Sequence, residues 1–296
     1  MPNFNLQYFN QRLSNTLIGT ILLILTYLFF SVMELTAKEL ALRFNPFLIV
    51  FARYLSQLIL LLIIFNKQFK THLKSNHKPL QILRGALLMI TTCFMFTGLA
   101  YLQFAENISI YMIGPVITTI LAILILKEKI SFTQIFVVII GLIGALIIAS
   151  PNKGAFNYAV IFPFLAALCF AFFTISTKFL NTSDSNQTTL LFTAITGTIL
   201  SLPFIIYFWK WPNLNDAILM FCLGFLATAG HFLFIEALKV ISASFAAPFV
   251  YLTVLLAAFW GYILYNEVPS QNTFIGAFLI ITSGFIITRF KKKNFK

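Results

Sequence analysis

Long apolar runs separated by short polar stretches fill the chain from residue 17 to residue 289. There are ten such runs, and they cover residues 17–37, 46–65, 80–101, 106–126, 132–149, 158–180, 187–208, 216–238, 243–264 and 272–289. About 20 apolar residues are needed to cross the hydrocarbon core of a bilayer. Runs of this length without strand-type alternation predict helices, because only helices and closed barrels satisfy the backbone in lipid. The pattern therefore predicts an all-α membrane protein with ten transmembrane helices.

Composition and charge sharpen this interpretation. Hydrophobic residues make up 60% of the chain and charged residues only 9%, and the net charge is +12. A soluble domain carries about 25% charged residues. The basic residues gather in short connections, above all in residues 66–79 and in the tail 289–296, which is typical of cytoplasmic loops and not of a nucleic-acid surface. We expect the lipid bilayer of the inner membrane as the surroundings, with both termini in the cytoplasm.

The second half of the chain repeats features of the first. Glu128 and Glu267 each end an apolar run, and they stand 139 positions apart (267 − 128). The same offset relates Gly85 to Gly224 and superposes the ends of the neighbouring runs. With five helices in each half, the second copy must be inverted across the membrane. The sequence predicts two inverted five-helix repeats, residues 1–150 and 151–296, which is typical of secondary transporters.

Glu34 lies inside the first apolar run, where a charged side chain is costly. A carboxylate at this depth could attract an amine-bearing or cationic substrate, or take up a proton that drives transport. The structural alternative is an i,i+4 contact with Lys38, one helical turn further on. The residue is the first candidate for substrate binding.

Three further polar residues lie within or at the end of apolar runs. His231 could serve a proton path, since histidine titrates near neutral pH, or it could be a core imidazole bonded to a hydroxyl such as that of Thr228. Glu236 could contact substrate, or it could meet Lys239 three residues on. Arg53 needs a partner in the membrane, and Gln57 is one turn away.

Motifs of soluble enzymes and ATP-driven pumps are missing from the sequence. We find no Walker A pattern, no GxSxG, no HExxH and no CxxC. The three cysteines all fall inside apolar runs and match no metal-ligand spacing. We expect no catalytic residues, no cofactor and no metal site.

Two segments resemble the halves of an EamA-type member of the drug/metabolite transporter superfamily. Residues 82–131 resemble the first half, with Arg84-Gly85, Pro115 and Glu128, and residues 236–270 resemble the second. The motif residues of the second segment are Ala247-Pro248, Tyr251-Leu252 and Glu267-Val268-Pro269. Glu34 four residues before Lys38, together with the Ala247–Leu252 stretch, is similar to the S-adenosylmethionine uptake branch of that family.

This resemblance implies a central cavity lined by the first, third, fourth, sixth, eighth and ninth helices. Tyr111 and Tyr251 fall in the fourth and ninth runs, and both are candidates to hold a substrate between aromatic rings. Gly114-Pro115 interrupts the fourth run; proline removes a helix hydrogen bond, so this point could be a hinge for alternating access or a passive kink.

The sequence therefore predicts a secondary transporter for a small polar organic metabolite, an amino acid or an S-adenosylmethionine-like compound. The alternative function is a membrane-embedded enzyme or lipid-handling protein that uses Glu34 and His231. Direction of transport, coupling to protons and oligomeric state, including a homodimer, stay open at this stage.

Overall fold

The computed structural model describes residues 6–102, 104–149, 158–265 and 271–293, and the secondary structure of these residues is helical throughout. The longer helices of the first half are α1 (Leu6–Ala41), α2 (Pro46–Phe65), α4 (Lys78–Tyr101), α5 (Phe104–Tyr111), α6 (Gly114–Leu124) and α7 (Phe132–Ala149). Those of the second half are α8 (Ile161–Leu180), α9 (Asn186–Phe208), α10 (Leu214–Val240), α12 (Leu252–Tyr265) and α13 (Gln271–Lys293). Short elements are η1 (Asn66–Gln68), α3 (Phe69–His72), η2 (Tyr158–Val160), α11 (Ala243–Ala246) and η3 (Ala247–Tyr251).

Polar residues at the predicted connections start several of these helices. Asn45 accepts a hydrogen bond from the Phe47 amide at 3.0 Å, directly before the proline that opens α2. Ser185 and Asn213 cap α9 and α10 in the same way. Such caps satisfy backbone N–H groups that have no partner inside the helix. The apolar runs therefore become helices with defined starting points.

Among the described residues, seven helices are long and apolar enough to cross a membrane. They correspond to the predicted runs 17–37, 46–65, 80–101, 158–180, 187–208, 216–238 and 243–264. The remaining three runs contain the shorter apolar helices Gly114–Leu124, Phe132–Ile147 and Phe274–Ile286. The chain is thus a multi-pass membrane protein.

The run 106–126 is interrupted beside Gly114-Pro115, as the sequence predicts. It is divided into α5 and α6 at Met112 and Ile113. Pro115 stands in the first turn of α6 and has no N–H to donate to the carbonyl of Tyr111, so the helix cannot continue unbroken. The run 243–264 is interrupted in a similar way, since α11 passes into the 3₁₀ segment η3 around Pro248 before α12 begins.

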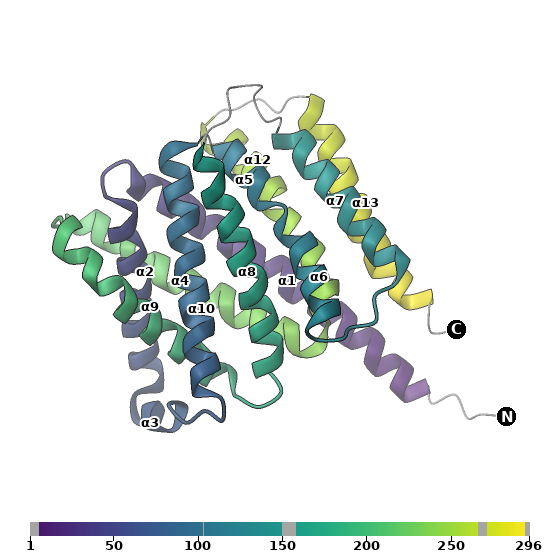
Figure 1. Cartoon of the computed structure of the whole chain (residues 1–296), viewed down its shortest axis with the longest axis horizontal. Helices are drawn as coiled ribbons and strands as arrows, with labels where there is room; N and C mark the ends of the chain where they lie inside the picture. Colours follow the sequence, from purple (N-terminus) through teal and green to yellow (C-terminus); the bar gives the residue numbers. More distant parts are fainter. Residues whose placement is uncertain (1–5, 103, 150–157, 266–270, 294–296) are drawn as a thin grey trace.

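Helices from the two halves pack against one another in a reciprocal pattern. α1 packs on α10 and α4 packs on α8, while α2 lies against α9 and α7 lies against α13. Figure 1 shows α7 and α13 side by side at one edge of the bundle and α2 and α9 at the opposite edge. Exchanging α1 with α8, α4 with α10, α2 with α9 and α7 with α13 leaves these pairings unchanged.

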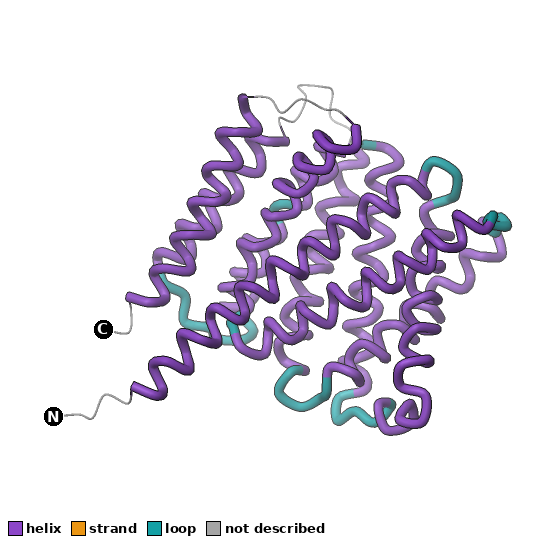
Figure 2. The backbone as a smooth tube through the Cα atoms, turned by 180° about the vertical axis from the view of Figure 1, so that it is seen from behind, coloured by secondary structure: helices purple, strands orange, loops and turns teal. Residues whose placement is uncertain are grey.

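The first and last residues of the helices also reflect the relation between the two halves. The offset of 139 connects the ends of α4 and α10 (Tyr101 and Val240), the starts of α5 and α11 (Phe104 and Ala243) and the starts of α7 and α13 (Phe132 and Gln271). In Figure 2 the two ends of the chain leave the same side of the bundle. The largest buried apolar cluster joins both halves and contains Tyr27, Phe173, Phe234 and Tyr251.

Candidate functional site

A cavity of about 90 Å³ lies between the two halves. Its wall is built by α1, α2, α4 and α5 from the first half and by α8, α10, η3 and α12 from the second. Apolar and aromatic side chains make up most of the wall, and the groups that carry charge or can carry it are Glu34, Arg53 and His231. A mostly apolar wall with few polar groups is the usual character of a small-molecule site.

Glu34 is half-buried on α1 and lines this cavity. Neither of the ion pairs found between described residues, Arg43–Asp216 and Lys239–Glu236, involves Glu34. Within the part of the chain that the structure describes, no hydrogen bond to the Glu34 carboxylate is found either. A carboxylate in this setting is available to a ligand that carries positive charge.

Arg53 reaches the cavity from α2 and is only 1% exposed. Its Nη2 lies 2.9 Å from Nε2 of His231, and its Nη1 donates to the hydroxyl of Thr92 at 3.3 Å. The predicted pairing with Gln57 is therefore wrong. The Gln57 amide is buried without a hydrogen-bond partner among the described residues.

The contact with Arg53 also defines the state of His231. A guanidinium only donates hydrogen bonds, so Nε2 of His231 must accept, and the proton of the neutral ring lies on Nδ1. The alternative partner Thr228 instead donates to the carbonyl of Gly224 at 2.7 Å. Phe30 covers the imidazole, with ring centroids 4.7 Å apart. His231 thus holds Arg53 in place at the cavity wall.

Tyr111, the last residue of α5, is half-buried and lines the cavity. Its ring centroid lies 6.0 Å from that of Phe170 on α8. The predicted hinge residues Gly114 and Pro115 follow directly, at the start of α6. The structure therefore puts the helix break next to an aromatic side chain of the cavity wall.

Two of the predicted site residues do not line this cavity. Tyr251 is fully buried elsewhere, and its hydroxyl donates to the carbonyl of Val138 on α7 at 3.0 Å. Its ring lies against Gly141, where an added Cβ would come within 2.4 Å of a ring carbon. Within the 3₁₀ segment η3, Tyr251 points towards α7, whereas its neighbour Val250 lines the cavity.

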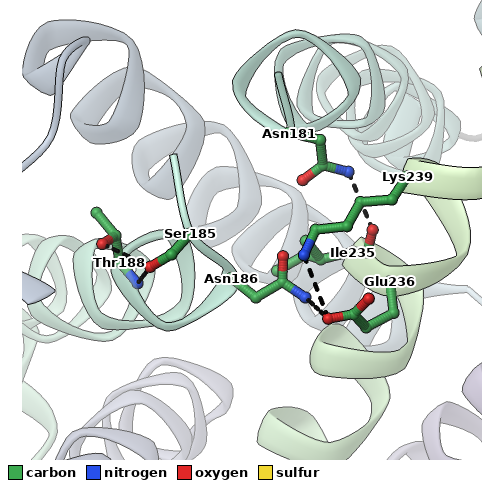
Figure 3. Close-up of polar contacts among 7 residues, drawn as sticks. All are labelled: Asn181, Ser185, Asn186, Thr188, Ile235, Glu236 and Lys239. Carbon is green, nitrogen blue, oxygen red and sulfur yellow. Dashed lines mark hydrogen bonds and ion pairs between the residues drawn. The ribbon is translucent and has the colours of Figure 1, made fainter. Parts of the chain in front are cut away.

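Glu236 is the second predicted site residue that does not line the cavity, and Figure 3 shows its surroundings. The amide of Asn186 at the start of α9 donates to its Oε1, and Nζ of Lys239 lies 3.3 Å from the same oxygen. This ion pair is the structural alternative that the spacing allowed. Glu236 joins α9 to α10 at one end of the bundle.

A carboxylate at the same end joins the two halves of the chain. The Glu128 carboxylate accepts hydrogen bonds from the amides of Ala243 and Ser244 at 3.0 and 3.1 Å, at the start of α11. Its repeat partner Glu267 lies outside the described residues. No group of three or more metal-ligating side chains occurs in the described ranges.

These features define a multi-pass membrane protein with a small, mostly apolar cavity between two related halves, into which a few polar groups reach. The model of the EamA-like transporter family matches residues 17–150 and again residues 157–289, and the chain belongs to this family. A solved structure superposes with a TM-score of 0.79 at 16% identity, over 94% of this chain and 97% of the other, which supports the same fold.

Several similar proteins carry names that describe transport of a small metabolite. The chain is 28% identical to an S-adenosylmethionine uptake transporter of Rickettsia prowazekii over 96% of this chain and 97% of the relative. It is 30% identical to the protein of that name from Rickettsia bellii, over 96% and 98%. A riboflavin transporter of Vibrio cholerae matches at 28% identity over 72% of each chain. The protein is a small-metabolite transporter and not an enzyme.

Proposed function

We propose that the protein is a secondary transporter that takes up a small, polar, amine-bearing metabolite of the S-adenosylmethionine type by alternating access. The observation that carries this proposal is the Glu34 carboxylate, which lines a cavity between the two halves without an ion-pair partner among the described residues. Since a charged side chain inside a membrane span is costly, a carboxylate there favours a functional role. A ligand with an amine would supply the missing positive charge.

The proposed architecture is ten spans in two inverted five-helix repeats, residues 1–150 and 151–296. The reciprocal packing of α1 on α10 and α4 on α8 supports it, as does the offset of 139 between helix bounds. The double family match supports the same division. In this architecture Gly114 and Pro115 form a hinge in the fourth span, next to the Tyr111 side chain that would contact substrate.

The proposed location is the inner membrane, with both termini in the cytoplasm. The basic loop 66–79 and the basic tail support this orientation, because Lys and Arg concentrate on the cytoplasmic side. The same side then carries the connections α8–α9 and α10–α11.

Transport is tested with the full chain reconstituted in liposomes. Uptake of labelled S-adenosylmethionine, a panel of labelled amino acids and riboflavin is measured with and without a pH gradient. We expect saturable uptake of S-adenosylmethionine. Glu34→Gln should reduce it at least about tenfold, because hydrogen bonds to charged groups contribute about 1.5–3 kcal/mol each.

The matched control is Glu39→Gln, on the same helix but exposed, which should transport like the wild type. Uptake of S-adenosylmethionine by Glu34→Gln at the wild-type rate would remove Glu34 from the mechanism. Uptake of riboflavin alone would replace the proposed substrate class. Wild-type liposomes that take up none of these compounds would contradict the proposed function as a whole.

A further inference from the structure

A carboxyl group and a guanidinium line the same cavity without forming an ion pair with each other. Glu34 reaches it from α1 and Arg53 from α2, and no ion pair joins them. The groups that hold Arg53 are neutral, since they are the hydroxyl of Thr92, the imidazole of His231 and the Tyr54 ring 4.5 Å from the guanidinium carbon. The cavity therefore offers a guanidinium and a carboxyl group at once.

Arg53 keeps unused capacity for an anion. A guanidinium has five N–H donors in a planar fork that matches a carboxylate, and two contacts from Nη1 and Nη2 occupy only part of it. Its Nε is buried with no hydrogen-bond partner among the described residues. Because an unneutralised guanidinium within a span is costly, an anionic group of the ligand would stabilise it.

A second buried arginine shows that burial alone does not make such a site. Arg84 is 0% exposed, donates from Nε to the hydroxyl of Thr177 at 2.7 Å and packs over the Phe173 ring. It does not line the cavity. Arg53 is the buried arginine that a ligand in the cavity could contact.

We infer that Arg53 binds the α-carboxylate of the transported compound while Glu34 binds its α-ammonium group, so that the cavity recognises an α-amino-acid moiety. This inference rests on the proposed function. A simple amine would leave Arg53 without a counter-charge and would be repelled by it. A simple anion would be repelled by Glu34. Only a ligand with both charges close together satisfies both side chains.

The size of the cavity fits recognition of one end of a larger molecule. Small-molecule sites usually measure about 300–1,000 Å³, whereas this cavity measures about 90 Å³. An amino-acid end group is the part that this volume suits. The adenosyl group of S-adenosylmethionine would need the cavity to widen, as it does when a transporter changes conformation.

The test compares ligands that differ only in the carboxylate. Binding of S-adenosylmethionine and of its decarboxylated form to the detergent-solubilised full-length protein is measured by ligand-induced thermal stabilisation and by competition with the labelled compound. We expect the wild type to bind the carboxylate form at least about tenfold more tightly, because a charge-assisted hydrogen bond is lost with the carboxylate. In Arg53→Gln this preference should disappear, so that the two ligands bind about equally tightly.

Gln57→Met is the matched control, since Gln57 lies one turn away on α2, is equally buried and does not line the cavity. It should keep the preference. Arg53→Lys, which retains the charge but loses the fork, should keep part of it. If Arg53→Gln does not fold, the comparison of the two ligands on the wild type still tests whether the cavity recognises a carboxylate.

Equal binding of both ligands to the wild type, or an unchanged preference in Arg53→Gln, would overturn the inference and leave the proposed transport function intact. If the protein instead binds a free amino acid, the same comparison is made with the corresponding decarboxylated amine. A substrate without any carboxylate, such as riboflavin, would also overturn it. Binding of no compound would count against the proposed function itself.

Discussion

The two ends of the helix bundle join the halves through different polar contacts among the described residues. At the end with the connections α2–α4 and α8–α9, Asp184 accepts hydrogen bonds from Ser75, from the Asn76 amide and from the Gln81 side chain. Glu128 binds the start of α11 at the same end, through two backbone amides and the Ser244 hydroxyl. All of these contacts cross from one half to the other.

The opposite end carries fewer such contacts among the described residues. Arg43 forms an ion pair with Asp216 at 2.9 Å, and Lys210 donates to the Arg43 carbonyl at 3.0 Å. Glu34 is seven residues from the end of α1 at Ala41, which is about 10 Å along a helix axis. The cavity therefore lies nearer the end with the Arg43–Asp216 ion pair, and we interpret the end with the basic loops as closed in this conformation.

The largest effect is expected from opening the closed end with Glu128→Ala. Three hydrogen bonds to the carboxylate are lost, each contributing about 1.5–3 kcal/mol. A cysteine introduced by Ala246→Cys, at a position only 2% exposed, should then react with a maleimide at least about tenfold faster. The native cysteines are first replaced by serine.

The control for this experiment is Lys129→Gln, which changes an exposed residue of the same connection. Its labelling rate should equal that of the parent protein. Equal rates for Glu128→Ala and Lys129→Gln would mean that Glu128 does not seal this end.

A smaller effect is expected from Pro115→Ala. This variant tests whether the break between α5 and α6 acts as a hinge during transport. Alanine restores an N–H that can donate to the Tyr111 carbonyl and so favours a continuous helix. Uptake should fall several-fold while the thermal stability stays equal or rises. Wild-type uptake in this variant would make the break a passive kink.

Arg43→Gln should have a weaker effect at the opposite end. The Arg43 side chain is 43% exposed, so solvent screens the ion pair from this side, whereas the Asp216 side chain is only 4% exposed. Asp216 keeps a favourable place in the first turn of α10, where its backbone N–H donates to the Asn213 cap. Uptake should change by less than about threefold, and a larger loss would show that this end is also a firm closure.

The smallest effect is expected for the pH dependence of protein stability that arises from Asp184, at the end with the basic loops. Burial opposes ionisation of its carboxyl, but hydrogen bonds from Ser75, Gln81 and the Asn76 amide outweigh it and lower the pKa. Because the pKa is lower in the folded state, this contribution to stability is complete above about pH 4 and is lost below it. Thermal unfolding between pH 7 and pH 3 should therefore show a smaller acid-induced decrease in Asp184→Asn than in the wild type.

Two pairings that the sequence allowed between neighbours on one helix are not formed among the described residues. They are Arg53 with Gln57 and His231 with Thr228. In the structure Arg53 meets His231, which is 178 residues away, and Glu34 faces the cavity. On a membrane helix, i,i+4 neighbours lie on one face, and a polar partner across the bundle competes with them for the same hydrogen bonds.

The sequence by itself determined the membrane class, the positions of most helices and the repeat offset, because hydropathy, proline positions and polar caps act over a few residues. Only the tertiary structure decided which side chains meet. In that structure Tyr251 contacts Val138, and Glu34, Tyr111 and Arg53 line one cavity. These contacts depend on how helices distant in sequence rotate and pack against each other, and that information is not contained in any single apolar run.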